Sequence, residues 1–261
     1  RSEARAAQNE TEQEEEKLFW ETFDDFSTYI REKTNCSVLR DPNAEADDLI
    51  ARWIALHPTD EHVIISSDSD FYQLITKNVT QFNGITDNLI TLEGIYDAKG
   101  KQVIDKKTKE PKLLGDPEWL LFEKCMRGDS SDNVFSAYPG VRKKGTKNKV
   151  GLLEAFEDRK SKGYAWNNMM LQRWTDHNGA EHRVLDDYNR NKELIDLTAM
   201  PDEIKDRVDL AIIEQLTNKD VGQVGSKFLK FCGKYELTRL SDNAEQYGRW
   251  LNQTYQGALK Q

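Results

Sequence analysis

The chain has few cysteines, and their spacing is not that of a zinc ribbon or a disulfide framework. Three occur in 261 residues, at Cys36, Cys125 and Cys232, and no Cys-x-x-Cys pair is present. An odd number of widely separated thiols argues against both kinds of scaffold and is compatible with a reducing compartment such as the cytoplasm. The 4 histidines also lack the spacing of zinc ligands.

Long hydrophobic runs are missing as well. No apolar stretch approaches the roughly 18–20 residues that a bilayer requires, and no secretory signal is visible. Acidic residues outnumber basic ones by 46 to 37, which gives a formal net charge of -9. This balance excludes a globally basic protein that coats DNA. It does not exclude nucleic-acid binding, because a local basic patch sets the electrostatic field near a bound nucleic-acid strand. We therefore expect no membrane partner and a cytoplasmic location.

The hydrophobic pattern divides the chain into an α/β half and a helical half. Strands are predicted at 36–39, 63–65 and 79–82, helices at 14–33, 44–57 and 71–76, and a hairpin or extended loop at 84–115. The alternation of strands and helices predicts a layer with a parallel sheet. From Asp116, which can cap a helix starting at Pro117, we predict only helices and loops. Those helices span about 148–157, 164–173, 183–196, 202–215, 223–232 and 242–254.

Acidic residues gather in three short segments, where a strand meets a helix or a helix meets a loop. They are Glu45, Asp47 and Asp48 in AEADDLIARW, Asp68 and Asp70 in VIISSDSDF, and Asp129 and Asp132 in MRGDSSDNV. Converging carboxylates repel one another unless cations lie between them, and hard oxygen ligands suit Mg²⁺ or Mn²⁺. Two such ions commonly serve phosphodiester hydrolysis, so the pattern predicts a nuclease.

Each acidic segment also has an ordinary structural explanation. Acids favour the first turn of a helix because of its dipole, which would account for Glu45 and its neighbours. Asp129 and Asp132 could form a simple Asx-turn or cap. Asp68 and Asp70 are harder to explain in this way, because a cap needs one of them and both follow a buried strand, where open α/β sheets bind ligands. The three segments together favour the metal site over these separate explanations.

A basic loop follows the last acidic segment. Tyr-Pro-Gly-Val, with its glycine at Gly140, leads into RKKGTKNK. The basic side chains are Arg142, Lys143, Lys144, Lys147 and Lys149. A lone charge run is usually a solvated loop. Beside an acidic pocket, however, a glycine-bearing turn with lysines around it is suited to binding phosphates of a nucleic-acid backbone.

The motifs EADDLIARW, IISSDSDFYQL and MRGDSSDN, followed by Pro-Gly-Val and the basic loop, resemble the 5′ nuclease (flap endonuclease) superfamily. The phage branch of the T-even ribonuclease H type is the most similar, also through YNRNKELIDL and MPDEI. The resemblance implies a PIN-like α/β nuclease core, then a helical half with a helix–three-turn–helix DNA-binding motif. It divides the chain into a remnant of a helical arch at 1–34, the nuclease core at 35–127 and a helical DNA-binding region at 128–261.

By this resemblance the seven acids correspond to the shell of two ions, Mg²⁺ or Mn²⁺. Glu45, Asp47 and Asp68 would mainly serve the first ion, and Asp70, Asp129 and Asp132 the second. Asp47, Asp68, Asp70 and Asp132 would be catalytic through the metals, with Asp48 also in the shell. The family removes primers or flaps from 5′ ends of DNA or RNA–DNA duplexes in replication and repair. Replisome proteins such as a single-strand-binding protein or a sliding clamp are the implied protein partners.

The sequence departs from the family pattern in two places. The family begins with a strand ending in Asp, and no such segment precedes residue 1, so we expect an N-terminally shortened chain that lacks two metal ligands and is weak or inactive. The turn reads Gly-Val-Arg-Lys-Lys-Gly instead of a tighter glycine-rich form. The family often binds a K⁺ ion at this turn, and the departure weakens the resemblance at that site. Two alternatives stay open: a duplex-DNA-binding replication accessory without catalysis, and a PIN-like ribonuclease.

Overall fold

The structure, a computed structural model, describes residues 10–215 and 220–255 and divides into two compact units. The first combines the described residues up to Ala44 with those from Asp206 onward, and the second runs from Glu45 to Lys205. The boundaries of these units differ from those of the predicted functional regions at 1–34, 35–127 and 128–261. Those regions were defined by expected function, and they stay a prediction. No helix among the described residues is both long and apolar enough to cross a membrane.

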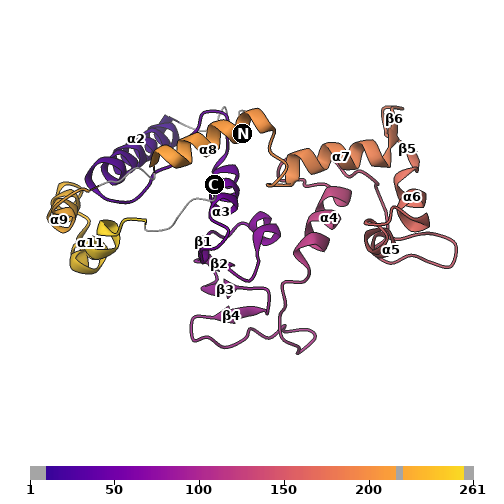
Figure 1. Cartoon of the computed structure of the whole chain (residues 1–261), viewed down its shortest axis with the longest axis horizontal. Coiled ribbons are helices and arrows are strands. Elements are labelled where there is room, and N and C mark those ends of the chain that lie inside the picture. Colours follow the sequence, from indigo (N-terminus) through magenta and orange to yellow (C-terminus); the bar gives the residue numbers. More distant parts are fainter. Residues whose placement is uncertain (1–9, 216–219, 256–261) are drawn as a thin grey trace. The chain divides into compact units, whose positions relative to one another are not determined.

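The second unit contains a sheet with the strand order β1-β2-β3-β4 (Figure 1). Strands β1 (His62–Ile65) and β2 (Val79–Asn83) are parallel, with His62 opposite Val79. Strands β3 (Asn88–Ile90) and β4 (Ile95–Asp97) continue the sheet in antiparallel register. The predicted hairpin within 84–115 is therefore confirmed. The predicted parallel pairing is present between β1 and β2, and the antiparallel part of the sheet lies in the hairpin segment, where the short links before β3 and β4 cannot make the crossover that parallel strands require.

Helix α3 (Ala46–Leu56) and the short 3₁₀ helix η1 (Ser69–Leu74) pack with the first two strands. The shared core is formed by small and branched apolar side chains and one aromatic ring: Ala51, Ile64, Phe71, Leu74, Val79 and Leu197. Both helices lie at the positions that the hydrophobic pattern predicts. Because η1 follows β1 directly, Asp68 and Asp70 lie at the carboxyl end of a parallel strand.

The second unit also contains the helices α4 (Pro117–Arg127), α5 (Leu152–Glu157), α6 (Tyr164–Met170) and α7 (Val184–Ile195). Asp116 caps α4 as predicted, because its carboxylate accepts a hydrogen bond from the Glu118 N–H at 2.9 Å. The aromatic side chains pack together in the core between these helices. They include Trp119, Phe122, Phe156, Trp166 and Tyr188.

A small hairpin in this region contradicts the prediction of helices and loops alone. Strands β5 (Arg173–Thr175) and β6 (Glu181–Arg183) are antiparallel, and Trp174 stacks on His182 with ring centroids 4.3 Å apart. The strands are too short and too polar to give a clear alternation. The residues of the turn are the better indication of a hairpin in the sequence. In the structure the Asp176 carboxylate accepts hydrogen bonds from the N–H groups of Asn178 and Ala180, and Gly179 has a φ of 83°.

The first unit is helical. It contains α2 (Glu10–Lys33), most of α8 (Asp202–Gln215), α9 (Val224–Lys234), α10 (Thr238–Ser241) and α11 (Ala244–Asn252). Its core brings α2 against α9 through Tyr29, Ile30, Phe228 and Cys232. The strand predicted at 36–39 is absent from this described segment. The N–H of Cys36 bonds to the Thr34 hydroxyl, and that of Asn35, just before the segment, bonds to the Leu251 carbonyl.

Candidate metal centre and basic loop

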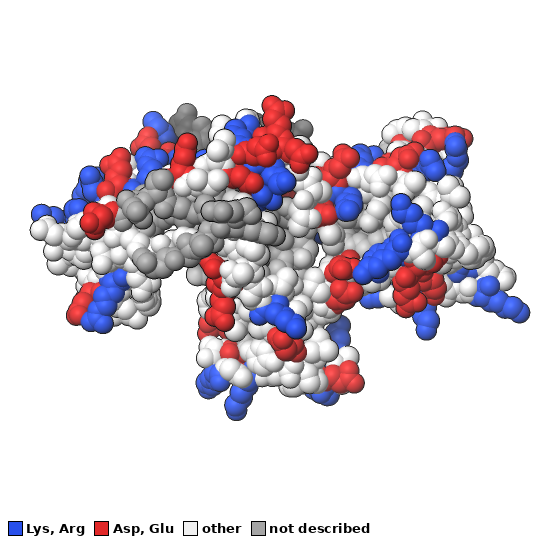
Figure 2. Space-filling view, viewed as in Figure 1, with Lys and Arg blue, Asp and Glu red and all other residues white. Residues whose placement is uncertain are grey.

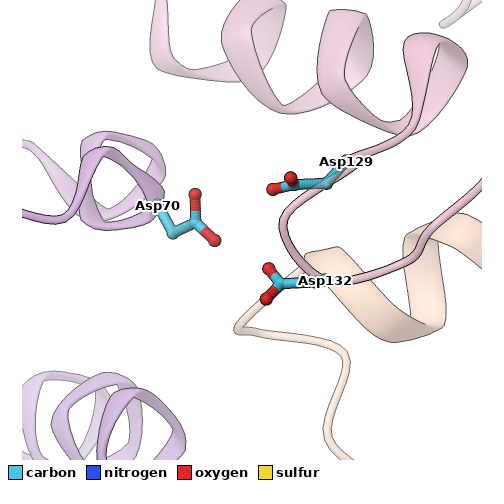
Figure 3. Close-up of side chains that lie close together, drawn as sticks. All are labelled: Asp70, Asp129 and Asp132. Atoms are coloured by element: carbon cyan, nitrogen blue, oxygen red, sulfur yellow. The ribbon is translucent and has the colours of Figure 1, made fainter. Parts of the chain in front are cut away.

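Three carboxylates from distant parts of the second unit converge on one point. Asp70, Asp129 and Asp132 each offer an oxygen, and these oxygens all lie within 4.8 Å of one another. Figure 3 shows Asp70 on the η1 side and the other two on the loop after α4, with the three side chains directed toward one another. We refer to these three residues as the acidic cluster. They are the residues that the resemblance assigns to the second ion.

Asp70 is held in place from the strand side. The Asp68 carboxylate accepts a hydrogen bond from the Asp70 N–H at 2.9 Å and so caps η1. Gln81 of β2 is fully buried, and its Nε2 donates to the carbonyl oxygens of Ser66 at 2.8 Å and Asp68 at 2.7 Å. The second strand therefore fixes the connection between β1 and η1. Sequence reasoning missed Gln81; the available signal was its place two residues after Val79, on the same face of the strand as that apolar residue.

The loop after α4 is closed at its base. Asp129 and Val134 exchange backbone hydrogen bonds of 2.8 and 2.7 Å, and Gly128 precedes this bridge with a φ of 77°. A Cβ on Gly128 would lie 2.3 Å from the Val134 carbonyl oxygen, so only glycine fits there. The Asx-turn that offered the ordinary explanation is present, since Oδ1 of Asp129 accepts from the Ser131 N–H at 2.9 Å. It uses Oδ1 only, and Oδ2 of Asp129 faces Lys124.

Asn191 of α7 supports the same loop from behind. Its side chain is fully buried, and Nδ2 donates to the carbonyl oxygens of Cys125 at 2.9 Å and Phe135 at 2.7 Å. These two carbonyls lie on either side of the loop that carries Asp129 and Asp132. Sequence reasoning did not single out Asn191. Its signal was a polar residue at helical spacing among apolar residues that face the core, between Val184 and Ile195.

Lys124 of α4 is a further part of the cluster that sequence reasoning missed. Its Nζ lies 2.6 Å from Oδ2 of Asp129 and also pairs with Oδ1 of Asp70. Hydrogen bonds from Lys124 and Ser131 lower the pKa of Asp129 to about 2. Burial of Lys124 opposes its positive charge, but the bonds it donates to Asp129 and Asp70 outweigh burial and raise its pKa above the ordinary value. The formal charge of the four side chains is -3 + 1 = -2.

The other four predicted ligands lie outside this group of three. Asp48 accepts a hydrogen bond from the Glu45 N–H at 3.0 Å, which is the capping arrangement of the ordinary explanation. Burial raises the pKa of Asp47 above its ordinary value. Asp68 caps η1, as described above. Within the described ranges these residues are not part of a three-ligand group, so their assignment to an ion stays a prediction.

The chemistry of the acidic cluster fits a divalent cation. Its donors are carboxylate oxygens, which are the ligands that Mg²⁺ and Mn²⁺ prefer. They come from a strand–helix junction and a closed loop, and buried amide groups hold both segments in place. Because these contacts already hold the carboxylates close together, a cation at this point would need little further ordering of the protein.

The predicted nucleic-acid-binding residues form a tightly clamped loop before α5. The Glu154 carboxylate accepts hydrogen bonds from the N–H groups of Gly145 at 3.0 Å and Gly151 at 2.9 Å. A Cβ on Gly151 would lie 2.3 Å from the Gly145 nitrogen, so the two glycines must meet closely. Backbone N–H groups, those of Glu154 first, lower the pKa of Glu154 against the effect of its burial. The N–H groups of Gly145 and Gly151 are thus occupied by Glu154, whereas the prediction that Gly140 and the basic side chains bind phosphates stays a prediction.

The basic side chains of this loop differ in their surroundings. Lys143 lies over the Trp119 ring at 5.2 Å and 3.9 Å from Glu123, so its charge is directed partly toward α4. Arg142, Lys144, Lys147 and Lys149 are exposed, and a hollow of about 480 Å³ beside them is lined by Tyr138, Gly140, Arg142, Thr146, Lys149 and Gln172, among others. In Figure 2, basic side chains project from the region where Figure 1 places α5 and its preceding loop, with acidic side chains beside them.

No protein-family model matches the chain. In sequence it is 34% identical over 137 residues to a 5′-3′ exonuclease of Buchnera aphidicola subsp. Schizaphis graminum, a match to 51% of this chain. It is 31% identical over 134 residues to DNA polymerase I of Rhizobium leguminosarum, a match to 49% of this chain. The matches span 40% of the exonuclease and 11% of the polymerase, well under two thirds of either relative.

Solved structures share the fold. The T5 D15 protein co-crystallised with metal ions matches with a TM-score of 0.51 and 20% identity, over 82% of this chain and 76% of that one. The bacteriophage T5 D15 flap endonuclease, in a pseudo-enzyme–product complex with DNA and metal ions, gives 0.50 and 19%, over 82% of this chain and 74% of that one. At this identity the likeness establishes the arrangement of helices and strands: a small central sheet among many helices.

Proposed function

We propose that this chain is a member of the 5′ nuclease superfamily and carries the metal centre of a divalent-metal-dependent 5′-3′ exonuclease or flap endonuclease. The observation that carries the proposal is the convergence of Asp70, Asp129 and Asp132 within 4.8 Å. The substrate class is the 5′ end of a DNA or RNA–DNA duplex, where the enzyme would remove primers or flaps during replication and repair.

The comparisons support this proposal from two sides. Curated sequence relatives are named 5′-3′ exonuclease, and their matches extend over about half of this chain. The structural neighbours, as described, were crystallised with metal ions, and one of them also with DNA.

The residues of the chain would divide the work as follows. Asp70, Asp129 and Asp132 would hold one ion, Mg²⁺ or Mn²⁺, and Glu45, Asp47 and Asp68 are the proposed ligands of a second. A bound ion of this kind supplies a water of lowered pKa and neutralises charge that develops on the phosphate oxygens. Asp68 also orients η1, and Asn191 holds the loop of Asp129 and Asp132 in place.

The basic loop would bind the substrate backbone. Its exposed lysines attract phosphates without regard to sequence, which suits an enzyme that recognises an end or a junction. A K⁺ ion at this turn, a sliding clamp or single-strand-binding protein as partner, and the cytoplasmic location all stay predictions.

The test is a matched pair of charge-neutralising variants, Asp132→Asn in the acidic cluster and Asp186→Asn on the exposed first turn of α7. Cleavage of a 5′-labelled flap DNA in Mg²⁺ is read from product lengths, and Mn²⁺ binding is measured by calorimetry without DNA. We expect Asp132→Asn to lose at least about a hundredfold in cleavage rate and most of the Mn²⁺ heat, because it removes a ligand. The Asp186→Asn variant should match the parent chain, and undiminished cleavage by Asp132→Asn would refute the assignment.

The same assay separates the alternative functions. A chain that binds duplex DNA through the basic loop but cuts nothing in Mg²⁺ or Mn²⁺ would be a replication accessory. Cleavage of single-stranded RNA without preference for a duplex junction would indicate a PIN-like ribonuclease.

A further inference from the structure

We infer that Lys124 is an internal counter-cation of the acidic cluster, which holds Asp70 and Asp129 together until a divalent ion displaces it. This inference rests on the proposed metal centre and goes beyond it. It assigns to a residue of α4 the task of setting how tightly the centre binds its ion.

The first observation is where the ammonium group lies. It pairs with Oδ1 of Asp70 and lies 2.6 Å from Oδ2 of Asp129, so it sits on two of the three carboxylates of the cluster. A divalent ion held by Asp70 and Asp129 needs carboxylate oxygens that Lys124 already engages. The ion and the ammonium group therefore compete for the same ligands.

The second observation is the charge balance. Three carboxylates whose oxygens lie within 4.8 Å repel one another strongly unless positive charge is near. The side chains of Lys124, Asp70 and Asp129 are only 25%, 21% and 15% exposed, which limits screening by water. One ammonium group offsets a single negative charge and leaves two. A divalent ion in its place would offset two negative charges and leave one, so the ion neutralises the three carboxylates better than the ammonium group does.

The third observation is that there is space beside Lys124 for its side chain to move into. A hollow of about 180 Å³ adjoins it, lined by Lys124 itself with Asp70, Tyr72, Gln73 and Leu121, among others. The flexible four-carbon stem of a lysine can carry the ammonium group into such a space without moving the helix. Displacement of the ammonium group then requires a change of side-chain conformation only.

The test compares Mn²⁺ binding by the parent chain and by Lys124→Met, measured by calorimetry at constant pH without DNA. Because no ammonium group has to leave, Lys124→Met should bind Mn²⁺ about tenfold more tightly. It should also melt at a lower temperature without metal and show a larger upward shift on adding Mn²⁺. Lys124→Gln provides a second, polar replacement in case the methionine variant folds poorly.

The matched control is Arg127→Gln. Arg127 lies on the same helix and also carries one positive charge, but it pairs with Glu123 at 3.0 Å and not with the cluster. If the loss of one positive charge acted only through the general electrostatic field, Mn²⁺ binding would tighten equally in both variants. Direct competition for the carboxylates predicts tighter binding in the Lys124 variant alone. Equal affinities for the Lys124 and Arg127 variants, or weaker binding without Lys124, would overturn the inference.

Combination with Asp132→Asn distinguishes failure of this inference from failure of the proposed function. If the parent chain binds Mn²⁺ and Asp132→Asn removes that binding, the metal centre stands whatever Lys124 does. If neither the parent chain nor any variant binds Mn²⁺ through the cluster, the metal centre and this inference both fall.

Discussion

The side-chain amide of Asn191 donates a 2.7 Å hydrogen bond to the carbonyl oxygen of Phe135, and thereby ties helix α7 to the loop that carries Asp129 and Asp132. The same nitrogen bonds to Cys125 at the end of α4. One buried side chain therefore spans the gap between a helix end and the returning chain.

Replacing Asn191 by leucine should destabilise the protein and loosen the acidic cluster. The change leaves two buried carbonyl oxygens without their donor, which costs about 2–3 kcal/mol of unfolding free energy. Urea unfolding measures this loss, and calorimetry with Mn²⁺ should show weaker binding. Asn189→Ala is the control, because Asn189 is exposed on the same helix. Unaltered Mn²⁺ binding in a folded Asn191→Leu variant would show that the loop does not depend on this anchor.

Gly128→Ala should be more harmful than the same change at another glycine with positive φ. Gly128 has a φ of 77° and Gly179 a φ of 83°, but a Cβ meets the Val134 carbonyl at 2.3 Å only in the first case and finds open space in the second. Gly179→Ala should therefore cost about 1 kcal/mol, the strain of a left-handed residue alone. Gly128→Ala adds a backbone clash and should cost more, as urea unfolding of both variants would show. Equal losses would contradict the close approach.

Neutralising Lys144 and Lys147 together should weaken duplex binding in a salt-dependent manner. Both side chains are exposed, whereas Lys143 is engaged by Trp119 and Glu123. If each contacts one phosphate, the slope of log K against log salt should become shallower by about 1.8. Fluorescence anisotropy with a duplex at several salt concentrations measures the slope. The double change Lys99→Gln and Lys101→Gln, in the exposed turn after β4, removes the same charge elsewhere and should leave the slope unchanged.

The Asp41–Arg207 pair should contribute an acid-sensitive part of the stability of the first unit. Two hydrogen bonds of 2.8 Å from the Arg207 guanidinium lower the pKa of Asp41 below its ordinary value. A carboxyl group with a lowered pKa in the folded state stabilises it above the unfolded pKa of about 3.9 and loses that effect as the pH falls further. The urea midpoint should therefore drop more between pH 5 and pH 3 in the parent chain than in Asp41→Asn. Parallel pH profiles for the two proteins would rule out this contribution.

Local features of the chain could be read from the sequence because neighbours in the chain determine them. The cap of α4 at Asp116, the helix over 202–215 and the strand–helix order around Asp68 and Asp70 all follow from periodicity and capping within a few residues. The hairpin at 173–183 was not predicted because its strands are short and polar. Their pairing depends on the Asp176 turn and on the stacking of Trp174 on His182.

The sequence by itself determined which acidic residues are available as metal ligands, their order, and the helices, strands and loops that carry them, since each follows from residues close together in the chain. Only the tertiary structure decided which of them meet: Asp70 joins Asp129 and Asp132 because η1 contacts α4 and because Asn191 holds the loop between α4 and the chain beyond it. The same packing placed Lys124 between two of the carboxylates. Distances between segments some sixty residues apart depend on how helices and strands pack, and local propensity carries no information about that packing.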